Sequence, residues 1–181
     1  MVALTELPGY AKLRAGWKPH RVRVLLVGES APDPGDAEGR FFYAPRLSGA
    51  DNLFRSVVTA FYSESPGRDG DAKAPWLERL RRDGVFLIDL VPYPVNGLPE
   101  RQRRAARRAH VADLTAAAAE LAPAGVIVCH TPTFELVAGP LTAAGVRVLH
   151  DNPIPFPIGT WRARFNADVR EALARLEDAA P

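Results

Sequence analysis

The sequence predicts a three-layer α/β/α sandwich with a central four-stranded parallel sheet. Four short apolar runs, at residues 22–27, 85–89, 125–129 and 146–149, have the continuous hydrophobicity of buried parallel strands. Helical patterns separate these runs, and such alternation is typical of a parallel sheet covered by helices on both faces. The 181 residues suit one domain, spanning 1–181, with a sizeable core.

Helices are expected between and after the strands. The first, at 51–62, begins at Asp51, a residue type that caps helices, and repeats apolar side chains at helical spacing. A shorter helix is expected at 74–82, and a long one at 99–121, ending before Pro123. Thr131 and Pro132 are typical of a helix start and predict a helix at 131–136. The last helix is expected at 160–176.

Composition restricts the class of protein. The formal net charge is only +2, so a nucleic-acid partner must be argued from local clustering of charge. The single cysteine, Cys129, excludes an internal disulfide, a four-cysteine iron–sulphur site and a zinc ribbon, and the histidines lack metal-ligand spacing. We therefore expect no metal and no cofactor. The chain has no secretory signal and no run of about 18 apolar residues, which predicts a cytoplasmic monomer without a membrane partner.

The turns after the predicted strands are expected to carry the site, because ligands of such sheets bind at the carboxyl ends of the strands. Three of these four turns are rich in proline, which fixes the backbone and removes amide donors. Stiff turns that meet at one edge predict a pocket there. His130 lies on the rim of this edge, and Trp161 is placed to flank a bound strand or to pack in the core.

The order of motifs resembles the uracil-DNA glycosylase superfamily. The turn GESAP at 28–32 is similar to the turn after the first strand of that family, and GRFF at 39–42 is similar to its base-stacking segment. GVFLID places Asp89 where the family has a base-reading Asn, and NPIP at 152–155 stands in place of its closing N-P-S motif. The likeness runs from about residue 22 to residue 165 and implies a glycosylase-like fold that acts on DNA.

The resemblance implies roles for particular residues. An aromatic ring stacks on a base held outside the helix, and a rigid turn brings backbone N–H groups to the departing base. We expect one of the two phenylalanines in the pocket, the other in the core, and Tyr43 more exposed. The implied catalytic residues are Glu29, Ser30, His150 and Asn152, the implied base-binding residues are Gly28, Phe41, Phe42 and Asp89, and Pro153 and Pro155 are implied to contact nucleic acid.

The sequence also departs from the family pattern. Ser30 stands where many members carry Asp or Asn, and because serine carries no charge, the role of that residue is weakened or taken by another. Asp33 and Asp36, in the same loop, could supply a carboxylate or serve as turn residues. Asp89, when ionised, offers only acceptors and suits a base with two adjacent donors, such as a guanine-like edge, whereas uracil suits a protonated Asp89. Alternatively, Asp89 points away and caps a neighbouring loop.

A run of arginines at 99–110 predicts contact with phosphate. On a helix, Arg101, Arg104 and Arg108 share one side, while Arg103, Arg107 and His110 share nearly the opposite side. Guanidinium groups match phosphate oxygens, although a solvated helix face is the usual explanation of a charge run. Three functions stay open: an N-glycosidase acting on a base in single- or double-stranded DNA, an N-glycosidase acting on a free nucleotide or nucleoside, and a catalytically silent nucleic-acid-binding module.

Overall fold

The computed structural model describes residues 7–33, 35 and 40–177, and its centre is a parallel sheet of three strands. The strands are β1 (Val24–Ser30), β2 (Val85–Val91) and β3 (Gly125–Val128), in the order β2-β1-β3. Val24 lies beside Val85 on one side and beside Gly125 on the other. The first two strands extend beyond their predicted ends. Glu29 therefore lies within β1 and not in the turn that follows it, and Asp89, expected as the last residue of its strand, lies two residues before the end of β2.

The predicted fourth strand is reduced to a single parallel bridge between Val126 and Val148. Val126 pairs through its N–H with Arg147 and through its carbonyl with Leu149, at 2.8 and 2.9 Å. Two residues further along β3, the amide of Val128 donates instead to the ring Nε2 of His150, at 2.9 Å. The prediction of four strands is wrong because this imidazole replaces the next backbone acceptor and ends the pairing.

The opposite edge of the sheet is closed in a similar way by Tyr43. Its hydroxyl donates to the carbonyl of Leu87 at 3.0 Å and accepts the N–H of the same residue at 2.7 Å. One side chain thereby satisfies both backbone groups that β2 presents at this point of its open edge. The expectation that Tyr43 would be exposed is wrong, because this bond requires its ring to be buried.

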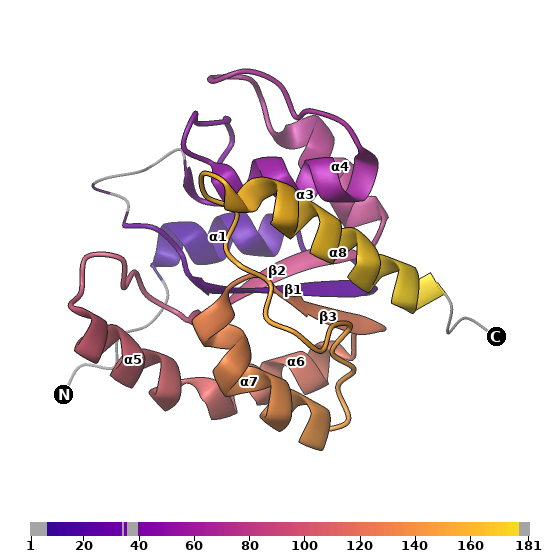
Figure 1. The fold of residues 1–181 in the computed structure, drawn as a ribbon. Helices are drawn as coiled ribbons and strands as arrows, with labels where there is room; N and C mark the ends of the chain where they lie inside the picture. Colours follow the sequence, from indigo (N-terminus) through magenta and orange to yellow (C-terminus); the bar gives the residue numbers. More distant parts are fainter. Residues whose placement is uncertain (1–6, 34, 36–39, 178–181) are drawn as a thin grey trace.

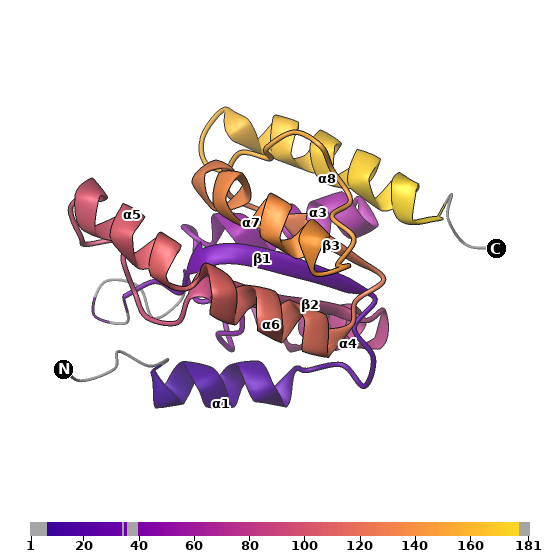
Figure 2. The same ribbon diagram turned by 90° about the horizontal axis from the view of Figure 1, so that it is seen from below.

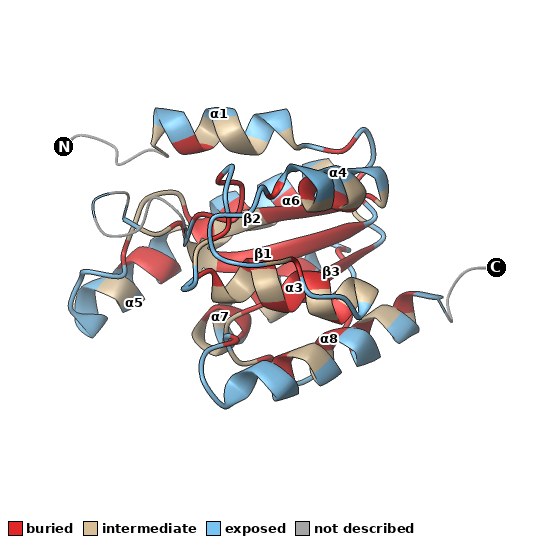
Figure 3. Cartoon of the chain, turned by 90° about the horizontal axis from the view of Figure 1, so that it is seen from above, coloured by how far each residue is buried: buried red, intermediate tan, exposed pale blue. Residues whose placement is uncertain are grey.

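Helices cover both faces of the sheet and form the outer layers of the predicted α/β/α sandwich (Figure 1). One face carries α3, α4 and α8, and the other carries α5, α6 and α7; α1 lies apart, beside β2 (Figures 1 and 2). The strands are buried, whereas the outer sides of the helices are exposed (Figure 3). The helices are α1 (Pro8–Gly16), α3 (Asn52–Tyr62), α4 (Ala74–Arg82), α5 (Glu100–Ala109), α6 (Val111–Leu121), α7 (Thr131–Ala143) and α8 (Trp161–Glu177).

The long helix expected at 99–121 is divided at His110, which ends α5 and precedes α6. The backbone of His110 leaves the helical region, at φ −105° and ψ 5°, and its ring packs edge-on against Tyr93, with centroids 5.5 Å apart. The break lets α5 turn away from α6 toward the carboxyl edge of the sheet (Figure 1).

Two other helices also differ from the prediction. The helix α7 continues past residue 136 to Ala143, and the sequence pattern did not predict α1.

A buried lysine holds the segment that carries the three consecutive aromatics. Lys73 is fully buried, forms an ion pair with Asp51, and donates to the carbonyls of Phe41 and Phe42 at 2.8 and 3.2 Å. Its ammonium also lies 4.4 Å from the ring centroid of Phe54. Asp51 stands at the N-cap position of α3, as predicted, but it forms no side-chain capping hydrogen bond, and its carboxylate is instead the counter-charge of this lysine. The position of the aromatic segment therefore depends on one ammonium group.

Candidate functional site

The carboxyl ends of β1 and β3 form a topological switch point. The chain leaves β1 toward α3 on one face of the sheet and leaves β3 into α7 on the other (Figure 1). In open α/β sheets the crevice at such a point is where ligands bind. Glu29, next to the end of β1, and His130, directly before α7, face each other across it, with Glu29 Oε2 4.0 Å from His130 Nε2.

Two arginines of α5 bind Glu29. Arg103 and Arg107 each donate to one carboxylate oxygen of Glu29, both at 2.5 Å, and Arg107 also bonds Glu100 at 2.5 Å. Arg107 is buried at 3% exposure, whereas Glu29 and Arg103 are partly exposed and Glu100 is exposed, so the ion-pair network reaches from the interior to the surface. We call Glu29, Arg103, Arg107 and His130 the Glu29 cluster. Both oxygens of Glu29 accept charge-assisted hydrogen bonds, so the two arginines hold this carboxylate in place.

His130 stands in a position that favours the neutral imidazole. Burial lowers the pKa of His130 below its ordinary value of 6.5, although the nearby Glu29 opposes this shift. Its Nδ1 lies 2.9 Å from the hydroxyl of the fully buried Thr133. The Glu29 carboxylate near Nε2 favours the tautomer with its proton on Nε2, and the Thr133 hydroxyl then donates to Nδ1. His130 is thus a neutral donor whose orientation is fixed.

An open groove of about 590 Å³ begins at His130. The start of α7 and the chain leading into α8 form its walls, and several apolar side chains in it are exposed, among them Ile158 and Trp161. We call it the edge groove. It is lined by His130, Thr131, Pro132, Pro153, Pro155, Phe156, Ile158, Trp161 and Arg164.

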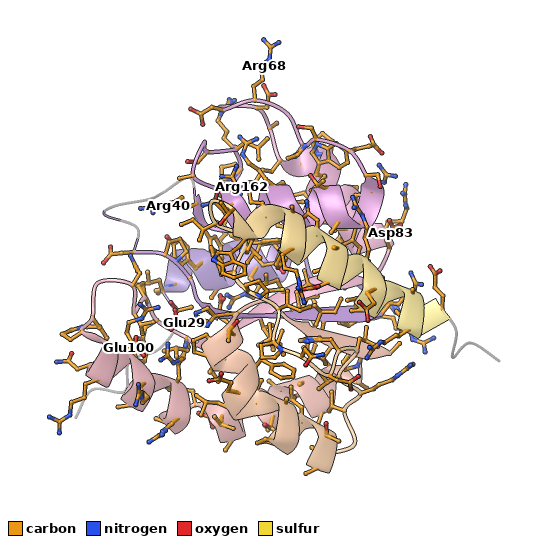
Figure 4. The ribbon with its side chains drawn as sticks, in the orientation of Figure 1. Glu29, Arg40, Arg68, Asp83, Glu100 and Arg162 are labelled. Atoms are coloured by element: carbon orange, nitrogen blue, oxygen red, sulfur yellow. The ribbon has the colours of Figure 1, made fainter. Side chains whose placement is uncertain are left out.

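The two faces of α5 have separate environments. Arg103 and Arg107 point to the protein and bind Glu29, whereas Arg101, Arg104 and Arg108 are exposed, as expected for contact with phosphate. Most of α5 is exposed, as the solvated-face explanation of the charge run expects, whereas Arg103 and Arg107 pair with Glu29. Figure 4 shows Glu29 and Glu100 close together at one edge of the molecule.

The predicted base-binding residues form a second group, whose side chains are largely buried. Phe41 and Phe42 are 1% and 6% exposed, so the expectation that one of them faces an open pocket is wrong: Lys73 draws both backbones into the core. The carboxylate of Asp89 lies beside Gly28 and accepts from Arg14 at 2.7 Å. A base-reading role for these residues stays a prediction.

Of the remaining predicted residues, some stabilise the fold and others line the edge groove. Ser30 Oγ accepts the N–H of Val95 at 3.4 Å. His150, predicted to be catalytic, has both ring nitrogens engaged, because Nε2 accepts from Val128 and Nδ1 donates to the carbonyl of Asn152 at 2.8 Å. His150 is therefore placed as a structural residue. Pro153 and Pro155 line the edge groove, as expected for contacts with a ligand.

Some motif positions are occupied differently or fall outside the described residues. Asp33 acts as a turn residue, since its Oδ1 accepts the N–H of Gly35 at 2.9 Å. Gly39, of the motif at 39–42, and Asp36 lie outside the described residues. The pairing of Glu29 with Arg103 and Arg107 was not predicted. The placement of these two arginines on one helical face was visible in the sequence, but the partner lies more than 70 residues away.

The two buried histidines predict how stability depends on pH. Burial lowers the pKa of both His130 and His150, so below about pH 6.5 the unfolded chain binds protons that the folded chain does not. The contribution of the two histidines to the free energy of unfolding should therefore fall as the pH drops below 6.5 and be constant above it, whereas Asp51, whose pKa burial raises to about 6, acts in the opposite direction as it takes up a proton in the folded chain. Chemical denaturation at about pH 7.5 and about pH 5.5 measures this loss.

The matched variant is His150→Gln, because a glutamine oxygen can accept the N–H of Val128 but does not titrate. On lowering the pH, we expect the free energy of unfolding of the parent to fall relative to that of this variant, because both keep Asp51 and only the parent keeps His150. The control is His20→Gln, at an exposed histidine, which should leave the pH dependence of the parent unchanged. An equal loss of stability at low pH in both variants would show that His150 is not responsible.

The fold and the site define an α/β protein with an open groove at the carboxyl edge of a parallel sheet. Among the described residues, no group of three or more His, Cys, Asp or Glu is placed to hold a metal, and none of the helices is long and apolar enough to cross a membrane. Comparison of the chain with family models, curated proteins and solved structures finds no match. The likeness to uracil-DNA glycosylases stays a prediction.

Proposed function

We propose that the protein binds DNA along the carboxyl edge of its sheet and hydrolyses the N-glycosidic bond of a base held in the edge groove. The observation that carries the proposal is that a neutral, oriented histidine forms the wall of an open, largely apolar groove. The motif order that resembles the uracil-DNA glycosylase superfamily supports the same reaction. The proposal includes the predictions, made from the sequence, that the protein is cytoplasmic and monomeric.

The side chains of the edge groove suit an unpaired base. Trp161 and Ile158 are 55% and 57% exposed, and apolar side chains gathered at one exposed place indicate a binding surface. Stacking of a base on an aromatic ring contributes about 1–3 kcal/mol and tolerates any base. Three prolines, Pro132, Pro153 and Pro155, stiffen the walls and limit the entropy lost when a ligand binds.

The exposed arginines of α5 supply the contacts to phosphate. Arg101, Arg104 and Arg108 lie on the face turned away from Glu29, and no carboxylate of the described chain pairs with them. Glu100, at the start of α5, lies at the same edge of the molecule as Glu29 (Figure 4). A strand whose base enters the edge groove then meets guanidinium groups on its phosphates.

The proposed chemistry uses His130 as a hydrogen-bond donor. When the bond between C1′ and the base nitrogen breaks, its electron pair stays on the base, which becomes negatively charged. The N–H of His130 stabilises this charge, water adds its oxygen to C1′, and the proton lost by the water passes to solvent. Glu29 orients His130 and keeps the positive charges of Arg103 and Arg107 in place. A preorganised donor of this kind stabilises the transition state.

The second candidate is a nucleic-acid-binding module without hydrolysis. Glu29, the predicted catalytic carboxylate, is held in ion pairs with two arginines, and Asp89, predicted to bind the base, is paired with Arg14, so neither is available to activate water. This observation favours binding alone over chemistry. Both candidates require the edge groove, and they differ only in whether a base is released.

One experiment separates the candidates. Labelled single- and double-stranded oligonucleotides, with and without uracil or other altered bases, are titrated with the protein and followed by fluorescence anisotropy. The same samples are then treated with alkali, which cleaves the strand wherever a base has been lost. Binding with cleavage supports the hydrolase, binding without cleavage supports the module, and the absence of binding contradicts both.

Trp161→Ala should weaken strand binding by about 1–3 kcal/mol, the contribution of one stacked base. Anisotropy titration of the same oligonucleotides measures the change. Leu98→Ala is the control, because Leu98 is an exposed apolar side chain that does not line the groove. Equal affinities of the two variants would show that Trp161 does not contact the strand.

The triple substitution of Arg101, Arg104 and Arg108 by alanine should flatten the salt dependence of binding. Each lost phosphate contact lowers the slope of log K against log salt by about 0.7 on single strands and about 0.9 on duplex DNA. The control removes the same charge from exposed arginines elsewhere, Arg21, Arg68 and Arg82. A slope that falls equally in both triple variants would indicate a general effect of net charge and not a site on α5.

A further inference from the structure

The ring of His150 connects the edge of the sheet to the chain that leads into the edge groove. Its Nε2 accepts the N–H of Val128 in β3 at 2.9 Å, and its Nδ1 donates to the carbonyl of Asn152 at 2.8 Å. The residue is 8% exposed, and its ring stacks on Phe134 of α7 with centroids 4.8 Å apart. A titratable side chain therefore stands where the next strand would offer a backbone acceptor.

The chain from residue 150 to residue 155, which we call the His150 segment, depends on this ring for its position. In the described part of the chain, no backbone–backbone hydrogen bond involves the segment. Besides the ring of His150, the buried side chain of Ile154 and an ion pair between Asp151 and Arg175 attach it to the protein. A segment held mainly by side chains belongs to the parts of a protein that open first.

The His150 segment also forms part of the wall of the edge groove. Pro153 and Pro155 both line the groove, on the side opposite the start of α7. The segment leads from the edge of β3 to the start of α8 (Figure 1). A change in its position therefore changes the shape of the groove.

The ring keeps both of its hydrogen bonds only while it is neutral. An imidazole with its proton on Nδ1 donates to Asn152 and accepts from Val128, whereas an imidazolium donates from both nitrogens. After protonation, the new N–H on Nε2 and the N–H of Val128 would face each other as two donors. Both buried groups would then lack an acceptor, which is unfavourable, so the charged ring does not fit the closed position.

The charged groups around His150 lie in a small crevice beside the ring, on its own segment and on α8. They are Asp151, Arg164, Asp168, Glu171 and Arg175. From β3 and α7 the ring meets the amide of Val128 and the phenyl ring of Phe134. Each of the three carboxylates is paired with an arginine of the same crevice. The crevice, of about 50 Å³, is large enough for water to bring a proton to the ring.

From this geometry we propose that His150 is a pH-sensitive switch: a proton from solvent binds Nε2, breaks the bond to Val128 and releases the His150 segment, which opens the wall of the edge groove. Burial lowers the pKa of His150 in the closed state below its ordinary value of 6.5, although the bond to Asn152 and the nearby carboxylates oppose this shift. In the released state the ring is solvated and regains its ordinary pKa. The open state therefore gains population as the pH falls below 6.5, and the switch is closed above it.

Amide hydrogen exchange of the unaltered protein, followed by NMR, tests the switch at a single backbone group. Between about pH 7.5 and about pH 5.5, the amide of Val128 should lose protection relative to that of Cys129 by up to about tenfold, the limit for one proton bound only in the open state. Cys129 is the internal control, because its N–H donates to the carbonyl of Val27 in β1, at 2.8 Å, and not to His150. Protection is the intrinsic exchange rate divided by the observed rate at the same pH. A constant ratio of the two protections contradicts the proposal.

The variant His150→Gln gives the second test. A glutamine oxygen accepts the N–H of Val128 at every pH, so the ratio of protections should no longer depend on pH, whereas His20→Gln, at an exposed position, should behave as the parent does. An undiminished pH dependence in His150→Gln contradicts the proposal. If this variant does not fold, the tautomer of His150 in the unaltered protein decides: nitrogen-15 NMR should show the proton on Nδ1 at neutral pH, and a proton on Nε2 contradicts the proposal.

The switch goes beyond the proposed function, because the amide of Val128 reports it without any ligand, whereas its effect on strand binding rests on that function. The affinity of the parent for oligonucleotides should fall relative to that of His150→Gln as the pH drops below 6.5. Equal pH dependence of the two affinities would contradict the opening of the groove. If Val128 responds to pH but oligonucleotides do not bind, the proposed function fails and the switch stands. If oligonucleotides bind but Val128 does not respond, the proposed function stands and the switch fails.

Discussion

Replacing Lys73 by methionine should lower the free energy of unfolding by about 3–5 kcal/mol, the range for removing one partner of a buried ion pair. The substitution leaves the carboxylate of Asp51 buried without its cation, and leaves the carbonyls of Phe41 and Phe42 without their donor. Burial already raises the pKa of Asp51 to about 6 and lowers the pKa of Lys73, so both charges depend on each other in the folded state. Urea denaturation measures the loss.

The control for Lys73→Met is Lys12→Met, which makes the same chemical change at an exposed position. A typical domain is stable by about 5–15 kcal/mol, so Lys73→Met should remove a large part of the total. Adding Asp51→Asn to Lys73→Met removes the unpaired charge and should restore part of the stability. A loss below about 1 kcal/mol, the level of a surface ion pair, would contradict the assigned role of Lys73.

His130→Ala should lower the rate of base release by about 10²–10³, the effect of removing one preorganised donor to developing negative charge. Strand affinity should change far less, because the groove keeps Trp161 and its prolines. The rate is measured under single-turnover conditions by alkaline cleavage, with anisotropy titration of the same variant. A fall in rate without a matching fall in affinity distinguishes a catalytic role from a loss of binding.

His20→Ala, at an exposed histidine outside the groove, is the control for His130→Ala. Equal rates for both variants would mean that His130 takes no part in the chemistry. If the parent binds strands but releases no base from any substrate, the hydrolase fails and the binding module is the remaining candidate.

Local patterns in the sequence predicted most of the elements. The apolar runs gave three parallel strands, and the helices at 51–62 and 74–82 lie within one residue of their predicted bounds. The fourth strand could not be excluded in this way, because the imidazole of His150 ends its pairing through a contact with Val128, 22 residues away. The break at His110 depends in the same way on a contact with Tyr93. Contacts of this kind with a distant side chain leave no pattern in the neighbouring sequence.

The predicted edge of the sheet, where the carboxyl ends of the parallel strands meet, is the edge at which the structure has the edge groove. The states of its charged residues were not predicted. Glu29 and Asp89 both looked available in the sequence, yet each is paired with arginine from a distant helix. The periodicity of α5 showed two arginine faces, but only the position of Glu29 in the fold decides which face turns inward.

Photo-crosslinking tests the central claim, that a nucleic-acid strand binds in the edge groove, most directly. A single-stranded oligonucleotide that carries one photoreactive base is irradiated with the protein, and the crosslinked peptide is identified by mass spectrometry. The claim predicts crosslinks within the segment that carries Phe156, Ile158 and Trp161, and their loss in Trp161→Ala. Crosslinks confined to other surfaces, such as the one around Trp76 and Arg79, would contradict it.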